Sequence, residues 1–185
     1  MSHVVLRRVS WMVFFGVALV GLGIGAVVAV LAVSAANGFR EGWQAIPVFL
    51  AIAGFIGRIG NCKVIIRDEV LTVVNPLRTH ILPKSAIRGV SVDGGGTLRF
   101  HLDQDREISS FAFGGSLIDH FVGSSGKAER KVEMWLRADR AESAAAAEAV
   151  APQARWTRCT SADAAIVLGV VVAAVGGIWM AFTSS

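Results

Sequence analysis

Three neighbouring side chains have the residue types of a hydrolytic triad. Ser116, Asp119 and His120 supply a hydroxyl nucleophile, a carboxylate and an imidazole within one short segment. A triad requires the imidazole to lie between the hydroxyl and the carboxylate, and the adjacent side chains of Asp119 and His120 cannot take that order. The sequence also lacks the G-x-S-x-G, H-E-x-x-H and P-loop patterns. We therefore expect no enzyme activity and no catalytic residues.

Metal and cofactor chemistry has equally little support. The two cysteines, Cys62 and Cys159, lie far apart and outside any CxxC or Cys/His spacing. They predict neither a zinc site nor a disulfide framework. The histidines His80, His101 and His120 fall on separate predicted elements. We expect no metal and no cofactor.

A second group of residues is basic. Five such side chains lie in or near the segment VVNPLRTHILPKSAI: Lys63, Arg78, His80, Lys84 and Arg88. On one surface they would bind an anionic lipid headgroup or a protein partner, with about 1 kcal/mol for each basic residue near an anionic leaflet. The alternative is a solvated rim without a specific ligand. A net charge of +4 is too modest to indicate nucleic-acid binding.

The composition of the chain is typical of a membrane protein. Its residues are 54% hydrophobic and only 17% charged, whereas a soluble domain carries about 25% charge. Apolar runs predict transmembrane helices at about 11–36 and 43–60, and a third within 161–185. A cleaved signal peptide is the alternative for the first run, with Ser34-Ala35-Ala36 as the cleavage site. The run exceeds a typical h-region, which favours an uncleaved anchor.

Basic residues concentrate on one side of the three runs, and the connector on the other side holds only Arg40, balanced by Glu41. The concentrated residues are Arg7 and Arg8 before the first run, Arg58, Lys63 and Arg67 after the second, and Arg155 and Arg158 before the third. Because such residues concentrate on the cytoplasmic side, we expect a cytoplasmic N-terminus and an external C-terminus. The excess of Arg over Lys and the many Ala, Gly and Val residues suggest a GC-rich bacterial genome, so the expected membrane is the bacterial inner membrane. Small helix faces would pack helices together or allow a homo-oligomer. Their glycines are Gly21 and Gly25 in the first run, and Gly54, Gly57 and Gly60 in the second.

Between the second and third runs, the hydrophobic period changes to two. About six short antiparallel strands are separated by turn signals at Asp68-Glu69, Asn75-Pro76, 93–96 and Gln104-Asp105. A short helix is expected from Ser116, and a longer one from about Lys127. The longer helix has one apolar face, made of Ala128, Val132, Trp135 and Leu136. The pattern predicts a cytoplasmic domain over 61–137 and a helical connector over 138–160.

The segment VLTVVNPLRTHILPKSAIRGV, with LRFHLDQDREI after it, resembles the bacterial PH-like family named for the mycobacterial low-molecular-weight protein antigen 6. The resemblance covers roughly 61–136 and implies a small membrane protein with one PH-like domain. The family usually has an aromatic residue where this chain has Lys84, and it offers no established catalytic residues.

The expected fold is therefore an α+β membrane protein. It would combine three transmembrane helices with a PH-like antiparallel β-sandwich, or partly open barrel, closed by a C-terminal amphipathic helix. The expected function is non-enzymatic: a protein-interaction scaffold for an unidentified membrane or cytoplasmic protein. The alternative is anionic-lipid headgroup sensing through the basic residues.

Overall fold

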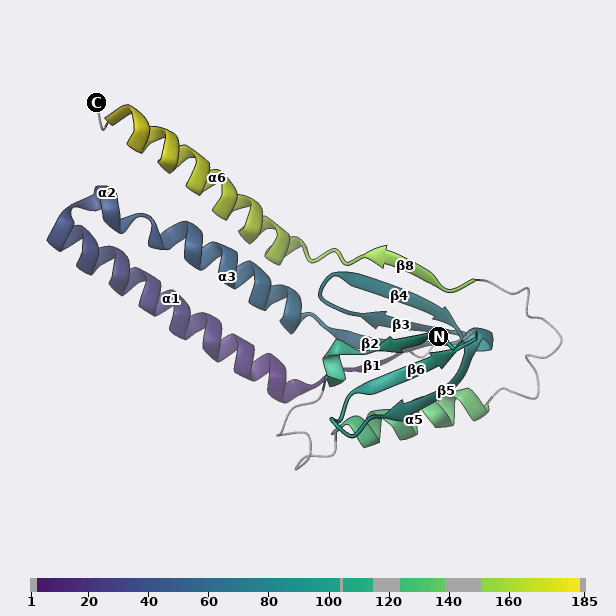
Figure 1. Ribbon diagram of the computed structural model, residues 1–185. Helices are drawn as coiled ribbons and strands as arrows, with labels where there is room; N and C mark the ends of the chain where they lie inside the picture. Colours follow the sequence, from purple (N-terminus) through teal and green to yellow (C-terminus); the bar gives the residue numbers. More distant parts are fainter. Residues whose placement is uncertain (1–2, 104, 115–123, 139–150, 184–185) are drawn as a thin grey trace. The chain divides into compact units, whose positions relative to one another are not determined.

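The computed structural model describes residues 3–103, 105–114, 124–138 and 151–183. The chain forms two compact units (Figure 1). The first contains Met1–Arg8 and Asn61–Thr157, and the second contains Val9–Gly60 and Arg158–Ser185. The short helix expected from Ser116 and the alanine-rich part of the connector lie outside the described residues.

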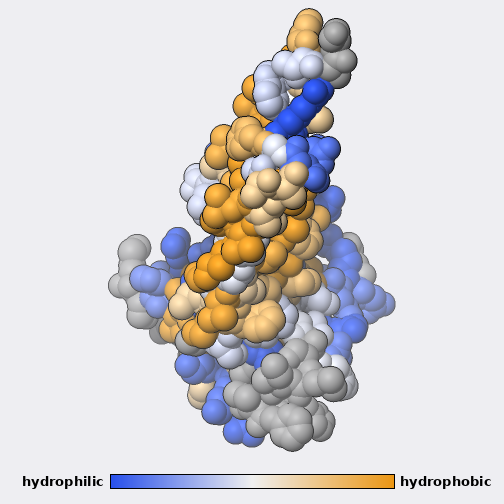
Figure 2. All heavy atoms as spheres, turned by 90° about the vertical axis from the view of Figure 1, so that its left-hand side faces the viewer, coloured by the Kyte–Doolittle hydropathy of each residue, from blue (hydrophilic) through white to orange (hydrophobic). Residues whose placement is uncertain are grey.

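The second unit is helical. Its elements are α1 (Val9–Asn37), α2 (Phe39–Gly42), α3 (Ala45–Gly60) and α6 (Thr160–Thr183). Within the described ranges, three segments are helical, long and apolar enough to cross a membrane: Ser10–Asn37, Phe39–Gly60 and Thr160–Thr183. They confirm the three predicted helices. Hydrophobic side chains cover most of the helical surface seen in Figure 2.

Glycines allow close contact between α3 and α6. A Cβ atom on Gly54 would lie 2.8 Å from the carbonyl oxygen of Ala162, and one on Gly169 would lie 3.3 Å from that of Pro47. Gly57 also packs on α6, so the small face of the second predicted helix has a packing role. A Cβ atom on the α1 glycines, Gly21 and Gly25, would meet no described atom within 4 Å. A homo-oligomer through that face stays a prediction.

Two arginines bond α6 near its two ends. Arg58, at the end of α3, forms an ion pair of 2.7 Å with Asp163 in the first turn of α6. The Arg58 side chain is only 10% exposed, and the ion pair with Asp163 compensates the charge at this buried position. Arg40 donates hydrogen bonds to the carbonyl oxygens of Met180 and Thr183 at 3.2 and 3.4 Å. A cation there also suits the negative end of the helix dipole.

The first unit contains two antiparallel sheets. Among the described residues, one sheet has five strands in the order β1-β2-β3-β4-β8, and the other has three in the order β5-β6-β7. The first comprises β1 (His3–Leu6), β2 (Lys63–Arg67), β3 (Val70–Val74), β4 (Arg78–Pro83) and β8 (Gln153–Trp156). The second comprises β5 (Ile87–Val92), β6 (Leu98–Leu102) and β7 (Glu107–Ser109). The helices are η1 (Lys84–Ala86), η2 (Phe111–Phe113) and α5 (Ser124–Ala138).

Two strands differ from the expected elements. Gln153–Trp156 is a strand where the sequence predicted a helical connector over 138–160. Pro152 interrupts a helix, and β4 offers an edge whose backbone groups gain partners in β8. His3–Leu6, expected only to precede the first helix, pairs along its whole length with β2 and buries Leu6. In addition, α5 begins at Ser124, three residues before the expected Lys127.

The core lies between the two sheets and α5. Alternate residues of the strands point inward, and Ala128 and Val132 of α5 are buried with them, which confirms the predicted apolar face. Fully buried apolar side chains are Val64, Leu71, Val73, Leu82, Leu98, Phe100 and Val132. Two antiparallel sheets and one packed helix confirm the predicted α+β class for this unit, although β8 follows α5 in the chain.

Trp135 connects α5 to the β2–β3 turn. Its indole nitrogen donates a hydrogen bond of 2.7 Å to the carbonyl oxygen of Asp68. The Nζ atom of Lys84 lies 5.0 Å from the centroid of the Trp135 ring, within the range of a cation–π interaction. Lys84 is buried, so this position faces the interior although its side chain is charged.

Candidate functional site

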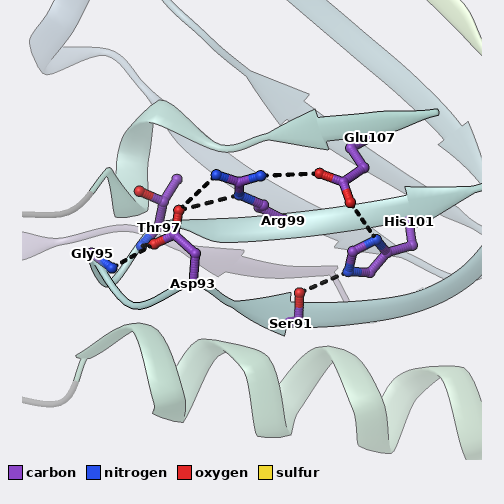
Figure 3. Close-up of polar contacts among 7 residues, drawn as sticks. All are labelled: Ser91, Asp93, Gly95, Thr97, Arg99, His101 and Glu107. Atoms are coloured by element: carbon purple, nitrogen blue, oxygen red, sulfur yellow. Dashed lines mark hydrogen bonds and ion pairs between the residues drawn. The ribbon is translucent and has the colours of Figure 1, made fainter. Parts of the chain in front are cut away.

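A polar network crosses the outer face of sheet β5-β6-β7. Because neighbouring residues of a strand point to opposite faces, Arg99 and His101 project outward while Phe100 is buried. The register brings His101 opposite Glu107 of β7 and opposite Gly89 of β5, which places Ser91 within reach. Figure 3 shows the resulting chain of contacts across the three strands.

The network has a defined order. Glu107 Oε1 lies 3.1 Å from His101 Nδ1, and His101 Nε2 lies 2.7 Å from Ser91 Oγ. Arg99 joins Glu107 to Asp93, with ion pairs of 3.1 and 2.9 Å.

The turn after β5 fixes the Asp93 end of this network. Asp93 Oδ1 accepts hydrogen bonds from the backbone N–H groups of Gly95 and Thr97 at 2.9 and 2.8 Å. The hydrogen bond from Thr97, together with those from Arg99 and Gly95, holds the pKa of Asp93 below its ordinary value. Hydrogen bonds to Glu107 and Asp93 raise the pKa of Arg99. Both side chains therefore stay charged over the physiological range.

Ser91, His101 and Glu107 reproduce the hydrogen-bond order of a serine triad. Acyl transfer also needs N–H donors for the developing oxyanion. The N–H groups of Gly95 and Thr97, in the turn that follows β5, are already bonded to Asp93. Arg99 donates a hydrogen bond to the same Glu107 carboxylate that would orient the imidazole. The arrangement better fits a set of cross-strand pairs that hold the register of the sheet.

The five predicted basic residues do not share one surface. Lys63 and Arg78 begin β2 and β4 at the same end of their sheet, whereas Lys84 follows the opposite end of β4 and is buried. Arg88 forms an ion pair with Asp103. His80 pairs with the buried Val73, so it faces inward. Burial, and to a lesser extent the charge of Arg78, lower the pKa of His80. Whether the five bind a ligand stays a prediction.

A different surface forms around the β3–β4 turn. Asn75 donates a hydrogen bond from Nδ2 to the Ser109 carbonyl oxygen at 2.9 Å and accepts one at Oδ1 from the Phe111 N–H at 2.8 Å. Thr157, which follows β8, donates from its hydroxyl to the Asn75 carbonyl oxygen at 2.8 Å and from its N–H to the Leu77 carbonyl oxygen at 3.0 Å. One turn thus positions the ends of β7 and β8.

This turn gathers exposed apolar side chains and basic residues. We call the set the Asn75 surface: Lys63, Leu77, Arg78, Phe111, Arg155 and Trp156. Leu77, Phe111 and Trp156 are 53%, 42% and 62% exposed. The sequence indicated Lys63 and Arg78 as binding residues but not the other four, of which Phe111, Arg155 and Trp156 belong to distant segments. Leu77, in a turn beside Pro76, was the one local signal.

Metal binding has no geometric support in the described ranges, where no group of three or more His, Cys, Asp or Glu side chains could hold an ion. Cys62 and Cys159 form no disulfide bond within the described part of the chain, and Cys62 is buried.

Residues 61–114 match the family model described as Bacterial PH domain. The match runs from the start of β2 through η2, and thus covers the strands on which the polar network lies. Comparisons with curated proteins and with solved structures give no match. The protein therefore contains a bacterial PH-like domain, to which the chain adds β1, α5 and β8.

Proposed function

We propose that three transmembrane helices hold this bacterial PH-like domain at the cytoplasmic face of the inner membrane, where it serves as a non-enzymatic scaffold for a protein partner. The likeness to the family of the mycobacterial low-molecular-weight protein antigen 6 is part of the proposal, and the bacterial PH match supports it.

The observation that carries the proposal is that strands of the first sheet adjoin all three long helices. β1 ends at Leu6 just before α1, β2 begins at Lys63 just after α3, and β8 ends at Trp156 just before α6. Strands of one sheet must lie on one side of a bilayer, so the three adjoining helix ends lie on that side too. The basic residues that flank these ends make it the cytoplasmic side. Retention of the first helix is part of the proposal, because cleavage after Ala36 would remove β1.

A protein partner suits the domain better than a headgroup pocket formed by the five predicted residues. Lys84 is buried and Arg88 is paired with Asp103, so these two charges do not form a joint binding site for an anion. Anionic-lipid sensing by that set is thus the weaker alternative. The outer face of sheet β5-β6-β7 instead presents charges of both signs in a fixed array, which favours specific recognition of a complementary protein surface.

Site-specific photo-crosslinking in native membranes tests the scaffold proposal. A photoreactive residue at Ser109, exposed on β7, should give a discrete protein adduct. The same residue at Val20, which is exposed on α1, is the control and should react mainly with lipid. Glu107→Lys should abolish the Ser109 adduct by reversing one charge of the array. A correctly inserted chain without a discrete Ser109 adduct contradicts the proposal.

Topology is tested separately with a reporter fused after Ser185. We expect activity of a periplasmic reporter and silence of a cytoplasmic one. The opposite pattern would contradict the three-span orientation.

A further inference from the structure

The Asn75 surface has the composition of a membrane interface. Its three exposed apolar side chains include Trp156, a residue type that concentrates at the boundary between hydrocarbon and headgroups. The three side chains come from separate segments, and hydrogen bonds to the single turn at Asn75–Leu77 organise those segments. The fold itself therefore holds these three side chains near one another.

Basic residues accompany the apolar ones. Two cross-strand rows form this end of the sheet, and the described register defines them: Lys63, Val74, Thr79 and Arg155 in one row, and Arg78 with Trp156 in the next. Successive rows lie on opposite faces of a sheet, so the basic side chains flank the end of the sheet on both faces. These rows contain three basic residues and no acidic one. Long basic side chains can place their charge among phosphates while their aliphatic parts contact apolar groups.

Chain connectivity brings this surface to the bilayer, given the insertion proposed above. Three residue steps separate Gly60 of α3 from Lys63, and four separate Trp156 from Thr160 of α6. A chain extends by at most about 3.6 Å per residue, so both strand ends stay within about 11–14 Å of the helix ends. The headgroup region occupies roughly 5–8 Å on each side of the hydrocarbon core. The opposite end of the sheet is separated from these short connections by the length of β2.

We infer that the Asn75 surface docks into the anionic headgroup layer of the cytoplasmic leaflet. Leu77, Phe111 and Trp156 enter the interfacial region, and Lys63, Arg78 and Arg155 contact lipid phosphates. This contact orients the domain, so that the polar network of sheet β5-β6-β7 is presented to its partner in a fixed direction. This docking of the Asn75 surface is separate from protein binding and requires only the bilayer.

Spin-label accessibility in nanodiscs tests the docking with the full chain. After Cys62→Ala and Cys159→Ser, one label is placed at Leu77→Cys, one at Glu69→Cys in the turn at the opposite end of β2, and one at Val20→Cys in α1. We expect the Leu77 label to lie at headgroup depth and the Glu69 label to be aqueous. The Val20 label reports membrane insertion by itself, and the reporter fused after Ser185 reports orientation, so failure of the docking and failure of the proposed function are distinguishable.

The charge dependence tests the lipid class. Nanodiscs of phosphatidylcholine alone are compared with nanodiscs that also contain phosphatidylglycerol. At about 1 kcal/mol for each basic residue, the combined substitutions Lys63→Gln, Arg78→Gln and Arg155→Gln should lower the docked-to-undocked ratio on the order of 100-fold. The matched control neutralises Arg67 and Arg137, which lie off this surface, and should change little.

High salt gives the same test without a substitution, because it screens exposed charges. We expect the Leu77 label to move toward water as salt rises. An aqueous Leu77 label in anionic nanodiscs overturns the inference, and is also the result expected if the surface binds a protein. The inference is also overturned if the Leu77 label stays at headgroup depth regardless of phosphatidylglycerol, salt and the triple substitution.

Discussion

Asn75→Ala should loosen the Asn75 surface without unfolding the domain. The substitution removes the Nδ2 hydrogen bond to the Ser109 carbonyl oxygen and the hydrogen bond that Oδ1 accepts from the Phe111 N–H. Each such bond contributes about 1 kcal/mol, so we expect a loss of about 2 kcal/mol. Alanine accepts the extended conformation that precedes Pro76, so the backbone of the turn should persist.

The effect should be local and measurable by hydrogen exchange of the full chain in nanodiscs. Loss of about 1 kcal/mol at the Phe111 amide should accelerate its exchange about fivefold. Asn75→Asp is the matched control, because it keeps an oxygen for the Phe111 N–H and loses only the donor to Ser109. Unchanged exchange at Phe111 in the alanine variant would refute the role of Asn75. Equal acceleration at the buried Phe100 would refute the expectation of a local effect.

Three further substitutions test other parts of the structure. Gly176→Ala should lower the thermal unfolding temperature, because its Cβ atom would lie 2.5 Å from Trp43 Cζ2 and overpacking costs about 1–3 kcal/mol. Trp135→Phe should cost about 1 kcal/mol in chemical unfolding of the domain, because it removes the hydrogen bond to Asp68. His80→Gln should flatten the dependence of stability on pH. Since the folded pKa of His80 lies below its ordinary 6.5, the unfolded state takes up the proton first, and stability falls as pH drops from about 6.5 through the folded pKa.

Each of these has a contrasting variant. Gly177→Ala changes the neighbouring residue, where a Cβ atom would meet nothing described within 4 Å, and should be tolerated. Trp179→Phe makes the same chemical change as Trp135→Phe in α6 and should not affect the domain. Thr72→Val, on the neighbouring strand β3, changes no titratable group and should leave the pH slope in place. A similar loss in both glycine variants, or a pH slope that survives His80→Gln, would contradict the corresponding explanation.

The sequence predicted those elements whose signals are local. The alternation of Leu98 to Leu102, the turn signals at Asp68-Glu69 and Asn75-Pro76, and the long uncharged runs each depend on a few neighbouring residues. No signal of this local kind predicts the register between strands. Ser91, His101 and Glu107 lie on three strands, and only the pairing of those strands brings them into contact. The polar network was therefore not predicted.

The Asn75 surface was missed for a related reason. Lys63 and Arg78 were recognised as basic. Phe111 joins them through a hydrogen bond to Asn75, and Trp156 through the pairing of β8 with β4, and both residues lie more than thirty positions away from that turn. Lys84 was grouped with the exposed basic residues because charge usually indicates exposure. Its burial beside Trp135 depends on where α5 packs, which local pattern does not determine.

The place of β1 in the chain has a consequence for biosynthesis. β1 is made before α1, and its partner β2 emerges only after α3. If one of those two helices failed to cross the bilayer, β1 and β2 would be stranded in different compartments. The edge of β2 would then stay open to proteases and to unrelated strands. In the proposed topology, β1 and β2 can pair only if α1 and α3 both cross the bilayer or neither does, so pairing of the two strands would distinguish a correctly inserted chain from one in which a single helix has crossed.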